Sequence, residues 1–259
     1  RELFSRTYSR TEAYLKANPL FKEKFGLERT PGSSVLQRAM TKVTMKYLRK
    51  VIRRLIMRYR RKGMTLALDS TGIRLKTSSH WFDIRIRRIS KRKDHMKLHI
   101  VVDVDTGIIL SFAGTDWKVN DGKQLKGLLR ELSKFEKMLG DKAYSSRVNY
   151  TLVHEKGGKA YFLFKENVSA RAKGSKHWHI QVKTFFSDRD AWMKEYHMRS
   201  FVEAVFSSIK RFIGSIVRSK KKSLKKRELA LKVLAYNLWR ALLIDTAENE
   251  GVPLWVTCK

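Results

Sequence analysis

Apolar and polar positions change their period at Gly63, and this change divides the chain into two patterns. Over residues 42–62, apolar side chains recur at helical spacing on an otherwise basic segment, which predicts an amphipathic helix. After Gly63, short apolar runs of strand length begin with residues 64–68. The chain is therefore expected to start with a helical region and to continue into a sheet.

The remaining elements are predicted from the same two periods. Further strands are expected over residues 82–87, 98–104, 108–113, 135–139 and 160–164, and helices over residues 121–133, 146–154, 191–212 and 228–244. Residues 165–190 are polar, basic and aromatic, and we expect a loop or a small irregular insertion there. Strands come first and then alternate with helices, which predicts an α/β fold with a mixed sheet flanked by helices.

The charge of the chain indicates its partner. Its 259 residues include 57 Lys and Arg against 24 Asp and Glu, a net charge of +33, so the protein attracts polyanions strongly. Nucleic acid is a commoner reason for this charge than a membrane surface. A protein that only neutralises phosphate is disfavoured, because 42% of the residues are hydrophobic. The basic helix over residues 42–62 can lie along a DNA backbone or pack with a solvated basic face, and a membrane-surface helix is a minor third reading.

Cysteine and hydropathy exclude several other classes. The single Cys258 allows no intrachain disulfide and no Cys-rich zinc site, which is consistent with a reducing compartment. The first residues are charged and show no signal-peptide pattern. Polar residues interrupt the longest apolar candidate, residues 229–244, so no membrane span is expected.

Three carboxylates are the candidates for chemistry. Asp69 ends the apolar run at residues 64–68, Asp141 directly follows a predicted strand, and Glu203 lies on a predicted helix. Magnesium prefers oxygen ligands and keeps several waters, so two or three carboxylates suffice to hold it. Two such ions can activate the attacking oxygen and stabilise the leaving oxygen of a phosphodiester. Acids grouped in a basic chain therefore suggest an enzyme that cuts or joins phosphodiester bonds.

Glu203 also belongs to a patterned helix face. At about 100° per residue, Tyr196, Arg199, Glu203 and Lys210 fall on one narrow face, and an apolar set falls largely on the other. Arg and Lys beside a carboxylate are suited to holding phosphates, Arg by its fork and Lys as a point charge. A solvated face of mixed charge is the alternative reading.

Other acids and histidines are weaker candidates. Asp103 also sits on a buried-looking strand and is kept as a substitute for Asp69. Asp121 is read as a helix cap in preference to a ligand. His177 and His179 lack a strong metal-ligand spacing, and a loop is favoured there.

Two tryptophans and a basic run have both structural and DNA-binding readings. Trp178 and Trp192 can stack on unpaired bases, but ordinary packing is favoured for each. Residues 220–226 form either a loop that contacts the DNA backbone or a solvated segment.

The motifs around the three acids resemble those of DDE transposases of prokaryotic insertion sequences, from the group named after insertion sequences four and five. Asp69 lies in a matching motif at residues 66–71, and Asp141 in one at residues 140–144. Tyr196, Arg199, Glu203 and Lys210 match the spacing Y-x2-R-x3-E-x6-K at every gap. The resemblance covers roughly residues 64–245.

This resemblance implies a ribonuclease-H-like catalytic domain over residues 63–250, with a basic insertion around residues 165–190. It implies that Asp69, Asp141 and Glu203 are catalytic and bind two Mg²⁺ or Mn²⁺ ions. Residues 1–62 resemble the variable, helical DNA-binding part of such proteins only loosely. The implied DNA-binding residues of the catalytic domain are Tyr196, Arg199 and Lys210.

The same resemblance implies cleavage at transposon ends and transfer of 3′-hydroxyl ends into target DNA. The partners would be double-stranded DNA, as ends and as target, and a second copy of the chain in a synaptic homodimer, in the cytoplasm at the nucleoid and with no membrane partner. A catalytically inactive DNA-binding derivative and a metal-dependent nuclease of the same fold are the alternatives.

Overall fold

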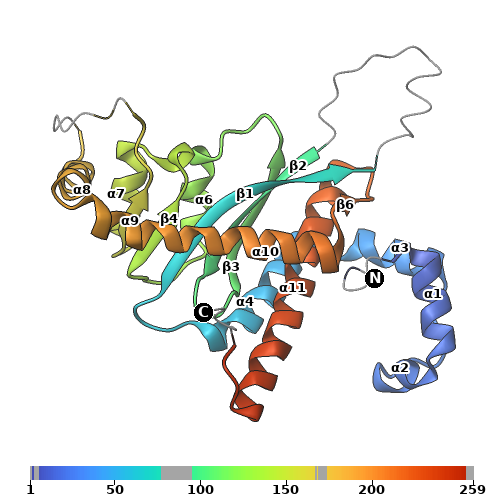
Figure 1. Cartoon of the computed structure of the whole chain (residues 1–259). Coiled ribbons are helices and arrows are strands. Elements are labelled where there is room, and N and C mark those ends of the chain that lie inside the picture. The colour runs from blue at the N-terminus through green and yellow to red at the C-terminus, as the bar shows by residue number, and fades with distance from the viewer. Residues whose placement is uncertain (1, 3–5, 77–94, 167, 169–173, 255–259) are drawn as a thin grey trace.

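The structure is a computed structural model, and it describes residues 2, 6–76, 95–166, 168 and 174–254. The strand expected over residues 82–87 lies outside the described residues. Figure 1 shows a central sheet, with α10 (Phe201–Ser208) crossing one face and the helices α1 (Tyr8–Ala17), α2 (Pro19–Lys24) and α3 (Ser33–Lys42) set to one side. Among the described residues, no helix is both long and apolar enough to cross a membrane.

The sheet has six strands and mixed polarity, as expected from the order of elements. β1 lies at its centre, between an antiparallel half and a parallel half, in the order β3-β2-β1-β4-β5. A short β6 pairs in parallel with the far end of β1. The strands are β1 (Thr65–Leu75), β2 (His95–Asp103), β3 (Ile109–Asp116), β4 (Lys137–Gly140), β5 (Lys159–Phe162) and β6 (Ile216–Val217).

β1 is longer than the sequence indicates. The apolar run predicts a strand that ends before Asp69, but β1 continues through Asp69 to Leu75. The extension is held by non-local pairing: residues 69–74 pair with β2 on one side, and residues 74–75 pair with β6 on the other. Asp69 therefore lies inside a paired strand, which restricts its backbone more than a strand end would.

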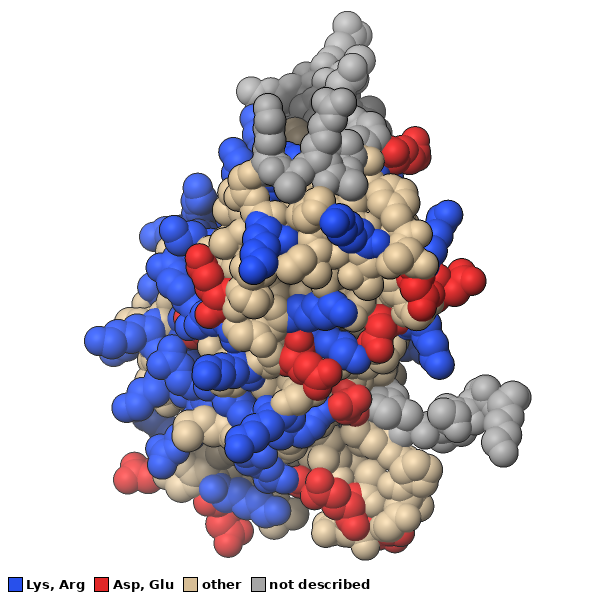
Figure 2. Space-filling view, turned by 90° about the vertical axis from the view of Figure 1, so that its left-hand side faces the viewer, with Lys and Arg blue, Asp and Glu red and all other residues tan. Residues whose placement is uncertain are grey.

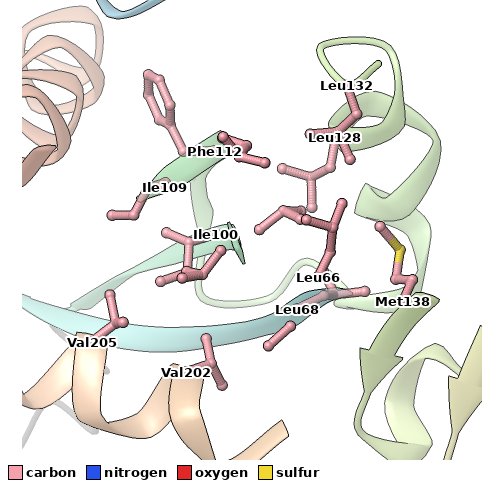
Figure 3. Close-up of a cluster of buried hydrophobic side chains, with 14 of the residues drawn as sticks. Leu66, Leu68, Ile100, Ile109, Phe112, Leu128, Leu132, Met138, Val202 and Val205 are labelled. Atoms are coloured by element: carbon pink, nitrogen blue, oxygen red, sulfur yellow. The ribbon is translucent and has the colours of Figure 1, made fainter. Parts of the chain in front are cut away.

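Helices cover both faces of β1 and bury its apolar side chains. Val202 and Val205 of α10 pack against β1 from one side, and Leu128 of α6 (Leu125–Leu129) approaches from the other (Figure 3). All three side chains are buried. This packing fixes α10 on the strand that carries Asp69.

α11 (Lys222–Glu250) covers the edge strand β3. Asn237 receives the backbone N–H of Ile109 on Oδ1 at 3.0 Å and donates from Nδ2 to the Ile109 carbonyl at 2.9 Å. One buried side chain thus takes the place of a neighbouring strand at this point of the edge.

The basic helix predicted over residues 42–62 is α4 (Met45–Ile56), followed by a 3-10 turn. Its stripe of Leu48, Ile52 and Ile56 is buried in the same core as the sheet. On its exposed side, Arg49 and Arg53 both pair with Glu131. α4 is therefore a packing helix with a basic outer face.

One helical prediction and one loop prediction differ from the structure. The helix expected over residues 121–133 is reduced to a 3-10 turn and the short α6. The irregular insertion expected over residues 165–190 contains α8 (Lys176–Ser187), which is capped by Ser175 and buries Trp178 and Val182. This segment is polar on average, so its composition does not reveal that one face of the helix is apolar. The helix α7 (Arg147–Glu155) begins after Ser146, close to its predicted start.

The helix expected over residues 191–212 is divided into four segments. α9 (Arg189–His197) ends at a 3-10 turn, Met198–Ser200, and α10 is followed by a π-helical segment, Ile209–Gly214. Lys232 of α11 is buried and donates from Nζ to the carbonyls of Ile213 and Gly214. A side chain from α11 therefore fixes the end of this helical series.

Candidate active site

Strand register brings Asp69 and Asp141 next to each other. Leu68 pairs with Gly140 in the parallel β1–β4 ladder, and each aspartate is the next residue on its chain. Neighbouring strands lie about 4.8 Å apart, so Asp69 and Asp141 each follow a residue whose backbone lies close to that of its partner. Gly140 permits this packing, because a Cβ there would lie 2.9 Å from Cδ1 of Phe162.

The Asp69 carboxylate is held on both oxygens. Oδ1 accepts the backbone N–H of Ser70 at 2.7 Å, and Oδ2 accepts Nη1 of Arg199 at 2.9 Å. Burial raises the pKa of Asp69; the Ser70 N–H and Arg199 oppose this rise, whereas the charges of Asp141 and Asp121 add to it. Asp69 is therefore a partly buried acid with two acidic neighbours and one cationic partner.

Arg199 joins Asp69 to Glu203. It lies in the 3-10 turn before α10, and its Nη2 donates to Oε1 of Glu203 at 3.1 Å. Burial lowers the pKa of Arg199, but Tyr196 and the three acids Asp69, Glu203 and Asp141 outweigh it, so the pKa is raised. The guanidinium stays charged at the centre of the site.

Tyr196 contributes to the site mainly by packing. Its ring is buried, stacks on Trp192 at 5.6 Å and lies under the Arg199 guanidinium at 5.8 Å. Trp192 and Trp178 belong to the same buried aromatic cluster, which also contains Phe164 and Phe185. Packing is thus the correct reading for both tryptophans, and this cluster anchors the turn that carries Arg199.

Lys210 lies just beyond α10, in the π-helical segment Ile209–Gly214. The predicted face assumes one continuous α-helix, whereas a 3-10 turn before α10 and a π-helical segment after it interrupt the α-helical hydrogen bonding. Lys210 is exposed in the π-helical segment. Within the described part of the chain, the ion pairs that connect Arg199 with Asp69 and Glu203 do not extend to Lys210.

The weaker candidates have structural roles. Asp103 is fully buried at the C-terminal end of β2, where it is paired in register with Leu66, forms an ion pair with Arg61 and accepts from Thr106. His177 and His179 lie on α8 instead of a loop, and the His177 ring stacks on His154 at 3.4 Å. Neither position is part of the acidic site.

Asp121 is not the helix cap that its sequence position predicts. At the start of the 3-10 turn it makes no capping hydrogen bond with its side chain. Its carboxylate instead accepts Oγ of Ser70 at 3.0 Å and Nζ of Lys97 at 2.7 Å. The available signal is Lys97, a largely buried cation on β2, which needs an acidic partner nearby.

The donor chemistry fits a hard divalent cation only in part. Asp69 and Asp141 offer carboxylate oxygens on adjacent strands, and such oxygens suit magnesium. Among the described residues, however, no three His, Cys, Asp or Glu side chains are grouped closely enough to hold a metal ion. Arg199 accounts for this, because its guanidinium lies between Asp69 and Glu203.

Comparison with known proteins places the chain in a family. A family model described as "Transposase DDE domain" matches residues 60–238, which is more than half of the chain. Over 173 residues the chain is 28% identical to a probable transposase for the insertion sequence element ISA1214 of Archaeoglobus fulgidus, covering 66% of this chain and 50% of that protein. The chain thus spans half the length of this relative. No solved structure matches the chain significantly. With its mixed sheet, ribonuclease-H-like fold and matched region, the chain belongs to the transposase DDE domain family.

Proposed function

We propose that the protein is a DNA transposase that cleaves at transposon ends and transfers the 3′-hydroxyl ends into target DNA. The observation that carries this proposal is the junction of Asp69, Arg199 and Glu203 beside Asp141, on strands and a helix of a DDE domain. Membership in the group named after insertion sequences four and five is part of the proposal.

Asp69, Asp141 and Glu203 are proposed to hold divalent ions, two Mg²⁺ or Mn²⁺ per site. Bound ions would supply Lewis-acid activation of the attacking oxygen and stabilisation of the leaving oxygen. The protein contributes placement: β1 and β4 fix Asp69 and Asp141 by register, and α10 carries Glu203 on a partly exposed side chain. For all three acids to bind ions, the Arg199 guanidinium has to move from its place between Asp69 and Glu203.

Arg199 and Lys210 are proposed to hold phosphates of the DNA, and Tyr196 to support Arg199 through its ring. Arg199 donates to Asp69 and Glu203. If both acids bind metal ions, the guanidinium N–H groups of Arg199 become available to a phosphate, which suits their paired geometry. Lys210 is exposed near the same helix and can act as a point charge.

Double-stranded DNA is the proposed substrate, both as transposon ends and as target, and the proposed working unit is a synaptic homodimer. Lys and Arg side chains dominate the left half of the face in Figure 2, in line with the net charge of +33. We assign the described helices of residues 1–62, and the outer face of α4, to backbone contact outside the catalytic domain. Such contacts weaken steeply with salt.

The test is cleavage and joining on a plasmid that carries candidate element ends, with Mg²⁺ or Mn²⁺. The parent chain should nick and join, and Asp141→Asn should lose both activities while it keeps its affinity for DNA. Asp245→Asn is the matched control, because Asp245 lies on α11, outside the site, and forms an ion pair with Arg58. Unimpaired cleavage by Asp141→Asn would contradict the proposal.

The same assay separates the two alternatives. A nuclease of this fold cuts but does not join a supplied 3′-hydroxyl end. A catalytically inactive derivative binds DNA in a salt-dependent manner and shows no nicking at any metal concentration.

A further inference from the structure

Asp121 lies in the turn between β3 and α6, and both of its oxygens are in use. Oδ2 accepts the Ser70 hydroxyl at 3.0 Å, and Oδ1 accepts Lys97 Nζ at 2.7 Å. Lys97 also donates to the Val119 carbonyl at 3.0 Å, so it holds the turn as well as its acid. With a side chain only 20% exposed, Asp121 connects the turn to both β1 and β2.

Ser70 transmits this connection to Asp69. Its hydroxyl donates to Asp121, while its backbone N–H donates to Oδ1 of Asp69 at 2.7 Å. The backbone of Ser70 is also paired with His99 of β2. Asp121 thus restrains the residue that orients the Asp69 carboxylate.

A second contact connects the same turn to Asp141. Asn149 of α7 is buried, and its Nδ2 donates to the Gly122 carbonyl at 3.2 Å and to the Tyr144 carbonyl at 2.8 Å. The two turns are in close contact, since a Cβ on Gly122 would lie 2.6 Å from the Ala143 carbonyl oxygen. The Asp121 turn therefore lies against the turn that follows Asp141.

Tyr144 indicates how close the three acids are. Its ring is fully buried, and its hydroxyl has no hydrogen-bond partner among the described residues. Burial raises the pKa of Tyr144, and the charges of Asp121, Asp69 and Asp141 raise it further. All three acids are thus near one buried ring.

We propose that Asp121 is a positioning residue, which sets the placement of Asp69 through Ser70 and relative to Asp141 through the turn held by Asn149. It acts through its neighbours, because its hydrogen bonds to Ser70 and Lys97 connect the turn to β1 and β2. The expected effect on metal binding and activity rests on the proposed function. The restraint of Ser70 by Asp121 does not depend on that function. Groups that orient metal-binding side chains typically change metal affinity or activity by about 10–100-fold when they are removed.

The test uses Asp121→Asn, Asp121→Ala and Ser70→Ala in the full chain. The amide of Asn replaces one acceptor by a donor, so one of the two bonds is weakened, whereas Ala removes both. Hydrogen exchange without metal should rise at residues 69–71, 119–124 and 141–145, more in the Ala than in the Asn variant. Mn²⁺ affinity, measured by calorimetry, should fall about 10–100-fold. DNA affinity in EDTA should stay at the parent value.

A double variant distinguishes a shared route from two independent effects. Asp121→Ala combined with Ser70→Ala should cost less Mn²⁺ affinity than the sum of the two single losses, since both remove the same connection. Asp188→Asn, which changes the N-cap of α9, is the control for loss of an aspartate with local hydrogen bonds.

Two results would overturn the proposal. The first is unchanged hydrogen exchange at residues 69–71 in Asp121→Ala. The second is complete loss of Mn²⁺ binding in Asp121→Asn, as deep as in Asp141→Asn and without faster exchange, which would make Asp121 a ligand. If the parent chain itself bound no Mn²⁺ and cut no DNA, the proposed function would fail, and the exchange data would still decide the positioning role.

Discussion

The guanidinium of Arg199 donates to Oδ2 of Asp69 at 2.9 Å, although the two residues are 130 positions apart in the chain. This pair joins the turn before α10 to the central strand, and the second nitrogen of the same guanidinium reaches Glu203. A cation in this place balances acids that would otherwise repel one another.

Replacing Arg199 should destabilise the chain without metal. Arg199→Gln removes a largely buried charge-assisted pair and leaves Asp69 beside Asp141 and Asp121. We expect the free energy of unfolding to fall by about 1.5–3 kcal/mol, measured by urea denaturation in EDTA. Arg58→Gln breaks an exposed pair with Asp245 and should cost at most about 1 kcal/mol. An equal loss of unfolding free energy in the two variants would show that the Arg199 pair contributes no more to stability than an exposed ion pair.

Divalent metal should stabilise the folded chain. Ions that bind only the native state add about 2.7 kcal/mol at 100 times their dissociation constant. The melting temperature should therefore rise by several degrees with Mg²⁺ or Mn²⁺ and return to its original value when EDTA removes the ion. The rise should be absent in Asp141→Asn and retained in Asp245→Asn. A metal-independent melting temperature in the parent chain argues against the site.

Lys232 should make stability depend on alkaline pH. Burial lowers the pKa of Lys232, and the charges of Glu2 and Glu228 only partly oppose it. The unfolded chain, with a Lys pKa near 10.4, then binds more protons than the folded chain in the window between the two pKa values. Stability from this group consequently increases as pH rises through that window.

The measurement is the free energy of unfolding of the parent and of Lys232→Met between pH 8 and pH 10.5. The parent should gain stability relative to the variant as pH increases, because the variant has no group to titrate there. The variant should also be less stable throughout, since the Ile213 and Gly214 carbonyls lose their donor. A constant difference over this range would contradict the lowered pKa.

Tyr196 should tolerate loss of its hydroxyl but not of its ring. Tyr196→Ala removes a buried ring stacked on Trp192 and should cost about 3–5 kcal/mol of stability, by analogy with large aromatic truncations. Tyr196→Phe keeps the ring and should stay within about 1 kcal/mol of the parent. Thermal and urea unfolding of both variants decide the matter. If Phe is as damaging as Ala, the hydroxyl matters more than the packing.

Local patterns in the sequence predict most of the sheet. The apolar runs at residues 98–104, 108–113 and 135–139 all overlap observed strands, and Asp141 does follow β4 as expected. The buried side of α10, with Val202 and Val205, also follows from helical spacing. These features depend on neighbours within a few residues, which is why period alone suffices.

The features that the sequence does not predict depend on distant partners. β1 extends past Asp69 because β2 and β6 pair with it, and no local signal marks the two residues of β6. Asp121 resembles a helix cap locally, yet its partner Ser70 is 51 residues away. The face of Tyr196, Arg199, Glu203 and Lys210 is predicted for an unbroken α-helix. The ion pair of Arg199 with Glu203 agrees with this face, but no local signal marks the 3-10 turn and the π-helical segment that interrupt the α-helix.

The pairing of Leu68 with Gly140 has a consequence for tolerance to change. Deleting or inserting one residue in the first half of β1 would leave every acid in the sequence intact. It would nevertheless move residues 66 and 68 to the opposite face of the sheet and move Asp69 out of register with Asp141, because side chains alternate along a strand. A comparison of decayed and working copies of such genes should therefore score frame-preserving indels near residues 65–68 as severely as loss of an aspartate.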